Sequence, residues 1–294
     1  MTPGLIVVAV LVILVIIFIL RAVYEVHRLQ VTEYNLESEK ICKNSGFKFA
    51  LISDLHLRKY GEGNAELIEI LKETEPDYIL LAGDMTTASP GKSDHELYEF
   101  LRIISRFAPV FYAPGNHEKH LAVDEEKFGD RYETLKAVCA DCGIKYLENE
   151  SVEIGKNVTV YGLDIDFDRY KKLKREHLSC EDIKEKLNSL DETRYNIILA
   201  HNPRFFESYV EFGPDLVLSG HIHGGVIRLA NGRGFISPQF RMFEKFSWGI
   251  FEKAKTKMIV SSGAGSHKVN IRLFNKPEVV VVNINGTDSS SSLI

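Results

Sequence analysis

The 294-residue sequence predicts an α/β domain in which buried strands alternate with amphipathic helices. Between residues 47 and 284, short apolar runs of strand length are separated by segments with helical periodicity. Several of the apolar runs are followed directly by motifs of histidine and carboxylate residues. This alternation is typical of layered domains with buried strands, whose ligands bind at the carboxyl ends of the strands.

The first half of this region alternates regularly. The expected strands are 47–53, 78–82 and 110–113, and the expected helices are 64–73, 94–105 and 131–142. In helix 94–105, apolar side chains at Leu97, Phe100, Leu101 and Ile104 fall on one face. Asn64 is expected to cap the first of these helices.

The second half is richer in strands. Residues 151–154 and 158–163 are expected to form a hairpin. A helix over 179–190 follows, with Ser179 as its N-cap. The remaining expected elements are strands 195–200, 215–219, 246–252, 258–262 and 279–284, with a short helix after Pro203. Together these elements predict an α/β domain whose strands are mostly buried.

The N-terminus carries an unbroken apolar run from Gly4 to Leu20. At about 1.5 Å per residue a helix of this length reaches roughly 26 Å, enough to cross a bilayer core. A cleaved signal peptide is the alternative, but no Lys or Arg precedes the run and no small-residue cleavage site follows it. We therefore expect a transmembrane anchor at 1–20, a polar stalk at 21–46, the folded domain at 47–284 and a disordered, Ser-rich tail at 285–294.

Positive charges lie on the C-terminal side of the apolar run, at Arg21, Arg28, Lys40 and Lys43. The positive-inside rule then places the folded domain on the cytoplasmic face of the cell membrane, as a single-pass protein. The net charge of -5 supplies no overall basic field, so no nucleic-acid polymer is expected as a partner.

Two further features have a structural and a functional interpretation. Cys139 and Cys142 form a C-x-x-C pair within a helical pattern, which favours helix packing over a zinc site. The basic cluster 169–175 is either a solvated face or a contact for anionic lipid or substrate phosphate. Arg228 and Arg233 are weaker candidates for substrate contact.

Five motifs contain the side chains that can bind metal ions. They are Asp54-Leu55-His56, Gly83-Asp84, Gly115-Asn116-His117-Glu118, Ala200-His201-Asn202 and Gly220-His221-Ile222-His223-Gly224-Gly225. At spacing i, i+2 on an extended segment, the two side chains of a pair such as Asp54 and His56 point to the same side. Mixed nitrogen and oxygen ligands suit Mn, Fe or Zn rather than calcium.

The order of these motifs resembles that of the calcineurin-like metallophosphoesterases over roughly residues 47–284. The stretches 199–203 and 217–225 are similar to the bacterial membrane-associated branch, which includes phosphodiesterases and enzymes that cleave the pyrophosphate of a nucleotide-linked lipid A precursor. The resemblance implies a metallophosphoesterase-type layered sandwich of two packed mixed sheets flanked by helices.

The resemblance also implies roles for individual side chains around two divalent metal ions. Asp54, His56 and His223 would hold the first ion, Asn116, His201 and His221 the second, and Asp84 would bridge both. His117 would not bind metal but would donate a proton to the leaving oxygen or hold the phosphate. Glu118 stands where many relatives have Asp, and we expect it to orient a neighbour.

We therefore expect a membrane-anchored phosphodiesterase or pyrophosphatase that uses a metal-bridged hydroxide, with a phosphoester or a lipid-linked pyrophosphate as substrate. One alternative is a non-catalytic, metal-stabilised interaction scaffold of the same fold. Another is a dinuclear amidohydrolase, for which the expected Lys or additional His pattern is missing.

Overall fold

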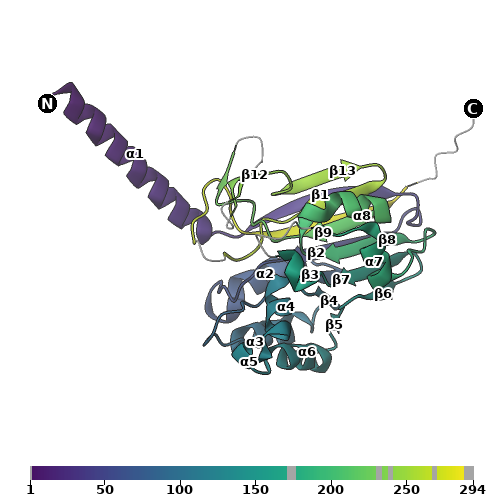
Figure 1. Cartoon of the computed structure of the whole chain (residues 1–294). Helices are drawn as coiled ribbons and strands as arrows, with labels where there is room; N and C mark the ends of the chain where they lie inside the picture. The colour runs from purple at the N-terminus through teal and green to yellow at the C-terminus, as the bar shows by residue number, and fades with distance from the viewer. Residues whose placement is uncertain (1, 171–176, 230–233, 238–240, 267–269, 288–294) are drawn as a thin grey trace, which may run out of the picture.

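The computed structural model describes residues 2–170, 177–229, 234–237, 241–266 and 270–287. Within them, an α/β domain is built on two six-stranded mixed sheets, and a long helix projects from it (Figure 1). The helices are α1 Pro3–Val26, α2 Ala65–Glu73, α3 His95–Ile104, α4 Asn116–Val123, α5 Glu125–Phe128, α6 Arg131–Asp141, α7 Cys180–Leu187 and α8 Phe206–Phe212, with short 3-10 turns at Glu62–Asn64, Phe167–Tyr170 and Pro203–Phe205.

The first sheet combines parallel strands from the N-terminal half with the two ends of the domain. Its strands, in spatial order, are β1 Gln30–Ser38, β15 Glu278–Gly286, β2 Gly46–Ile52, β3 Tyr78–Ala82, β4 Val110–Ala113 and β5 Lys145–Tyr146. Strands β2 to β5 are parallel, and β15 runs antiparallel to β2. The carboxyl ends of β2, β3 and β4 therefore share one edge.

The second sheet has four parallel strands with an antiparallel strand at each side. Its order is β13 Gly249–Lys253, β14 Thr256–Val260, β9 Leu216–Ser219, β8 Tyr195–Ala200, β7 Val158–Leu163 and β6 Glu150–Ile154. The expected hairpin of β6 and β7 is confirmed. A third, small sheet contains β10 Ile227–Arg228, β11 Gly234–Ile236 and β12 Met242–Glu244.

Three apolar clusters show how the layers stack. Leu51, Leu80 and Leu199 belong to the cluster between the two large sheets. A second cluster packs α2, α3 and α6 against the outer face of the first sheet, and a third packs α7 and α8 against the second. Strands that are buried on both faces explain the continuous apolar runs in the sequence. The expected sandwich of two mixed sheets flanked by helices is confirmed.

Helix α1 is long and apolar enough to cross a membrane. Its most apolar stretch has a mean hydropathy of 3.4, and none of that stretch is buried inside the protein. The expected polar stalk at 21–46 is not found as such, because α1 continues to Val26 and β1 begins at Gln30. Ala22, Glu25 and Val26 are buried against the domain, and residues 30–38 form β1 instead of a polar linker. The chain thus passes from the apolar helix into the first sheet with only a short connection.

Some local expectations need correction. Asn64 precedes α2 but makes no capping hydrogen bond to it, because its Oδ1 accepts from the backbone N–H of Tyr60 at 3.0 Å. Ser179 does cap α7 in a capping box with Asp182. The expected tail 285–294 begins inside β15, which extends to Gly286, while residues 288–294 lie outside the described residues. Cys139 is buried in the helical core, and burial raises the pKa of its thiol to about 12.

Candidate metal centre

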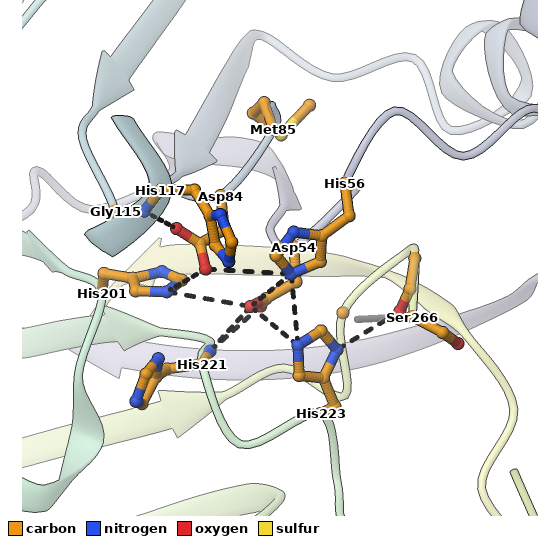
Figure 2. Close-up of polar contacts among 12 residues, drawn as sticks. Asp54, His56, Asp84, Met85, Gly115, His117, His201, His221, His223 and Ser266 are labelled. Atoms are coloured by element: carbon orange, nitrogen blue, oxygen red, sulfur yellow. Dashed lines mark hydrogen bonds and ion pairs between the residues drawn. The ribbon is translucent and has the colours of Figure 1, made fainter. Parts of the chain in front are cut away.

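The polar motifs converge where the carboxyl ends of strands from both large sheets meet (Figure 2). Each motif follows its strand within three residues, so the parallel arrangement brings the side chains to one place. The residues placed after β2, β3, β4, β8 and β9 are Asp54, Asp84, Asn116, His201 and His221, in that order.

Backbone hydrogen bonds join the loops that carry these residues. The N–H of Asp54 donates to Gly83 O at 2.9 Å, and the N–H of His56 donates to Asp84 O at 3.0 Å. Five motif residues have left-handed backbones, namely Asp54 (φ 53°), His56 (φ 50°), Asp84 (φ 55°), His221 (φ 70°) and His223 (φ 55°). Such conformations cost about 1–3 kcal/mol each and cluster at functional sites.

One group of ligand atoms comes from Asp54, His56 and His223. The two imidazole Nε2 atoms of His56 and His223 lie 3.3 Å apart. Asp54 Oδ1 lies 3.5 Å from His223 Nε2 and 3.9 Å from His56 Nε2. All three side chains can therefore reach one ion between them.

A second group comes from Asp84, His201 and His221, whose ligand atoms all lie within 4.8 Å of one another. Asp84 Oδ2 lies 3.1 Å from His201 Nε2 and 3.7 Å from His56 Nε2, so this carboxylate faces both groups. Asn116 Oδ1 is buried and has no hydrogen-bond partner among the described residues. A buried carbonyl oxygen without a donor is an expected feature of a metal ligand, because leaving it unsatisfied is otherwise costly.

The distances fit divalent ions. For bonds of about 2.1 Å, two ligands of one ion lie roughly 3.0–3.4 Å apart, and the 3.1 and 3.3 Å separations fall in this range. The imidazoles are also oriented for binding. Nδ1 of His201 lies 2.7 Å from Ala82 O, and Nδ1 of His223 lies 3.3 Å from Gly265 O. Each ring thus donates its Nδ1–H to a carbonyl and directs the Nε2 lone pair into the centre.

The centre contains two buried carboxylates, Asp54 and Asp84, whose negative charge needs a positive partner. Burial raises the pKa of Asp84. Burial also lowers the pKa of His201, but the carboxylates of Asp84 and Asp54 outweigh this effect and raise it to about 10. Burial lowers the pKa of His223 to about 4, which leaves its imidazole neutral. Without metal, the raised pKa values of Asp84 and His201 keep a proton on this pair. Bound cations would take the place of that proton and balance the negative charge of the two buried carboxylates.

His117 lies at the N-terminus of α4 and forms a third group of close-lying polar atoms with His56 and Asp84, all within 4.8 Å of one another. Its backbone N–H donates to Asp84 Oδ1 at 2.7 Å. Its Nδ1 accepts a hydrogen bond from the N–H of Ala88 at 2.8 Å, so the neutral ring carries its proton on Nε2. The ring stands edge-on to His56, with 4.8 Å between the centroids.

Glu118 is fully buried and organises the loops after β3 and β4. Its carboxylate accepts hydrogen bonds from the N–H groups of Asp84 (2.8 Å), Met85 (2.8 Å) and Gly115 (2.9 Å) and from the Tyr112 hydroxyl (2.6 Å). The expected orienting role of Glu118 thus extends to two loops at once.

Other residues near the centre were not identified from the sequence. Nη1 of Arg204 lies 3.5 Å from His221 Nε2, and the ring centroid of Tyr170 lies 5.3 Å from that of His221. The side-chain amide of Asn275 donates to His223 O at 2.7 Å. These residues come from separate turns and form no motif, so only the fold brings them together.

Two of the weaker candidates for substrate or lipid contact, Arg228 and Arg169, interact with other side chains of the domain. Arg228 is buried and stacks on Trp248, with its guanidinium carbon 3.8 Å from the ring centroid. Arg169, at the start of the basic cluster, pairs with Asp182 at 3.0 Å. Residues 171–176 and Arg233 lie outside the described residues.

The chain is similar to several known proteins. Residues 47–225 match the family model for calcineurin-like phosphoesterases. The chain is 31% identical over 265 residues to an uncharacterized metallophosphoesterase of Aquifex aeolicus, covering 89% of this chain and 94% of the relative. It is 29% identical over 245 residues to the uncharacterized protein YpbG of Bacillus subtilis, covering 81% and 80%. Phosphopantetheinyl hydrolase of Mycobacterium tuberculosis aligns in structure with a TM-score of 0.45 at 15% identity, covering 76% of this chain and 94% of that one.

Proposed function

Since this chain belongs to the calcineurin-like phosphoesterase family and is a metal-dependent phosphoesterase, we propose that it hydrolyses a phosphodiester or a pyrophosphate bond at a two-metal centre. The proposed ligands are Asp54, His56 and His223 for one ion, Asn116, His201 and His221 for the other, and Asp84 for both. The single observation that supports this proposal best is the position of Asp84 between the two groups of ligand atoms.

The nitrogen-rich ligand set favours Mn, Fe or Zn. When bound, two such ions lower the pKa of water and offset the negative charge of a phosphate group. The protein's own contribution is to fix the geometry before substrate arrives. The Ala82 and Gly265 carbonyls hold two imidazole rings in place, and Glu118 holds the loop of Asp84.

His117 is proposed to act directly on the substrate. With Nδ1 occupied by the N–H of Ala88, the ring presents Nε2–H to the centre. This arrangement favours a hydrogen bond to a phosphate oxygen or to the departing oxygen, because a second proton on Nδ1 would face the amide hydrogen of Ala88. His117 and Asp84 are thus the proposed catalytic residues.

We further propose that α1 is a membrane anchor and that the protein is a member of the bacterial membrane-associated branch. The exposed apolar helix Pro3–Val26 supports this proposal, and the following cations favour the cytoplasmic face. A domain attached to the bilayer in this way is well placed for a lipid-linked phosphoester or pyrophosphate.

The test uses the full-length chain purified in detergent and stripped of metal. We expect hydrolysis of bis(p-nitrophenyl) phosphate to return on addition of Mn²⁺, Zn²⁺ or Fe²⁺, with two ions bound per chain by elemental analysis. Two bound ions without turnover would favour the scaffold alternative. A chain that binds no metal would refute both.

A further inference from the structure

Large apolar side chains are exposed on two segments beside the base of α1. Met242 and Phe243 on β12 are 56% and 59% exposed, and Ile271 and Phe274, which precede β15, are 51% and 53% exposed. We call these four residues the apolar rim. Two aromatic and two aliphatic side chains grouped at one side of a domain mark an interaction surface rather than scattered exposure.

The two segments are connected through the small sheet. The N–H of Leu273 donates to Val226 O at 2.9 Å, and the N–H of Arg228 donates to Leu273 O at 3.0 Å, so the segment 271–274 extends the small sheet beside β10. Strand β12 forms the other side of that sheet. Figure 1 shows β12 on the side of the domain from which α1 projects.

One segment of the apolar rim also contacts the end of α1. Glu25 accepts a hydrogen bond from the N–H of Asn275 at 3.0 Å, and the Arg21 guanidinium lies 5.9 Å from the centroid of the Phe274 ring. A helix of 24 residues spans about 36 Å, which exceeds the roughly 30 Å thickness of a hydrocarbon core. Its last turn therefore reaches headgroup depth, and that turn is the one packed against the domain.

Residues next to both segments are linked to the metal centre by hydrogen bonds. Asn275 holds the carbonyl oxygens of His223 (2.7 Å) and Gly225. Glu244, the residue after Phe243, pairs with Arg204, which reaches His221. Asn275 thus contacts the backbone of the proposed ligand His223 directly, and Glu244 is linked to the proposed ligand His221 through Arg204.

We propose that the apolar rim enters the headgroup layer of the bilayer in which α1 is anchored, so that the metal centre meets its substrate at the membrane surface. The bilayer is the occupant that this geometry selects, because a membrane-spanning α1 leaves no spacer between the rim and the headgroups. The substrate class that follows is an amphiphilic phosphoester or pyrophosphate whose tail stays in the membrane. The inference rests on the proposed anchoring by α1 and on the proposed hydrolysis.

The depth of the rim is measured with the full-length chain in vesicles of phosphatidylglycerol and phosphatidylethanolamine that contain brominated acyl chains. Phe243→Trp is the reporter, and Val123→Trp is the matched control, since Val123 is 55% exposed on α4. We expect bromine to quench the reporter more than it quenches the control or the native Trp248. Equal quenching of reporter and control, or a dimer that forms through the rim in detergent, would overturn the proposal.

A second measurement links the apolar rim to turnover. A double variant that carries Phe243→Ser and Phe274→Ser should hydrolyse hexadecyl p-nitrophenyl phosphate in vesicles about tenfold more slowly or worse. The reason is that the apolar rim loses both of its aromatic side chains. Hydrolysis of soluble bis(p-nitrophenyl) phosphate should stay within about twofold. A parallel loss of both activities would contradict the inference. A wild-type chain without either activity would refute the proposed hydrolysis, while the quenching result would still decide the position of the rim.

Discussion

The carboxylate of Glu118 accepts a hydrogen bond from the backbone N–H of Asp84 at 2.8 Å, and this contact links α4 to the loop that carries the proposed bridging ligand. The same carboxylate binds the N–H of Gly115 at 2.9 Å, on its own loop. No side chain that accepts only one hydrogen bond could replace it, because the carboxylate satisfies several buried donors together.

Replacing Glu118 with Gln should therefore damage both stability and activity. The amide places an NH₂ group where Glu118 now accepts from backbone N–H groups, so buried donors face each other. We expect the free energy of unfolding in urea to fall by about 2–4 kcal/mol. Glu126→Gln, at an exposed position of α5, is the control and should leave the urea midpoint unchanged. A Glu118→Gln chain as stable as the wild type would contradict this account.

Asp84→Asn should remove hydrolysis and weaken metal binding at both positions. The neutral amide loses the negative charge that faces both groups of imidazoles, and an amide nitrogen cannot bind the second ion. We expect hydrolysis of bis(p-nitrophenyl) phosphate to fall at least about 100-fold, with fewer than two ions per chain by elemental analysis. The control is Asp141→Asn, at an exposed position at the end of α6. Full metal content with full activity in Asp84→Asn would disprove the bridging position.

Gly220→Ala should disturb the centre through Asp54. A Cβ at residue 220 would lie 2.1 Å from Asp54 Oδ2 and 2.6 Å from Ser53 Oγ, so the carboxylate must move. We expect at least about tenfold weaker metal affinity, measured by competition with a chelator. Gly4→Ala on α1, where nothing lies within 4 Å of the added Cβ, should not change the affinity.

The capping box of α7 predicts a pH dependence of stability. The Ser179 backbone N–H and the Arg169 guanidinium lower the pKa of Asp182 to about 2. Because the folded pKa is below the unfolded value of about 3.9, this stabilisation is present above pH 4 and is lost as the pH falls toward 2. Urea unfolding of the wild type and Asp182→Asn should differ at pH 7, and the difference should shrink below about pH 4. A difference that stays constant to pH 2.5 would exclude this role.

Much of the fold followed from the sequence because most of its strands are buried on both faces. The expected strands 78–82 and 110–113 agree with β3 and β4. Strand β1 was missed because one of its faces is solvated and its partner β15 lies far away in the chain. The small sheet was missed for a related reason, since strands of two or three residues depend on tertiary contacts.

The candidate site could be predicted from the sequence for a different reason. Its motifs are local pairs such as His221 and His223, each directly after a strand, so topology alone predicts their convergence. The supporting residues have no such signal. Asn275 reaches the His223 loop across 52 positions of the chain. Arg204 becomes relevant only because the turn Pro203–Phe205 lies beside the loop that carries His221. Residues that act through tertiary contact are visible only in the folded chain.

The pairing of β1 with β15 has a consequence for biosynthesis. Gln30 aligns with Glu278, so β1 leaves the ribosome long before its partner β15. At about 5–20 residues per second, the earlier strand waits for roughly 12–50 s with its backbone groups unpaired. During translation this segment is open to chaperones and to mispairing with other nascent chains, and the first sheet is complete only after β15 has been synthesised.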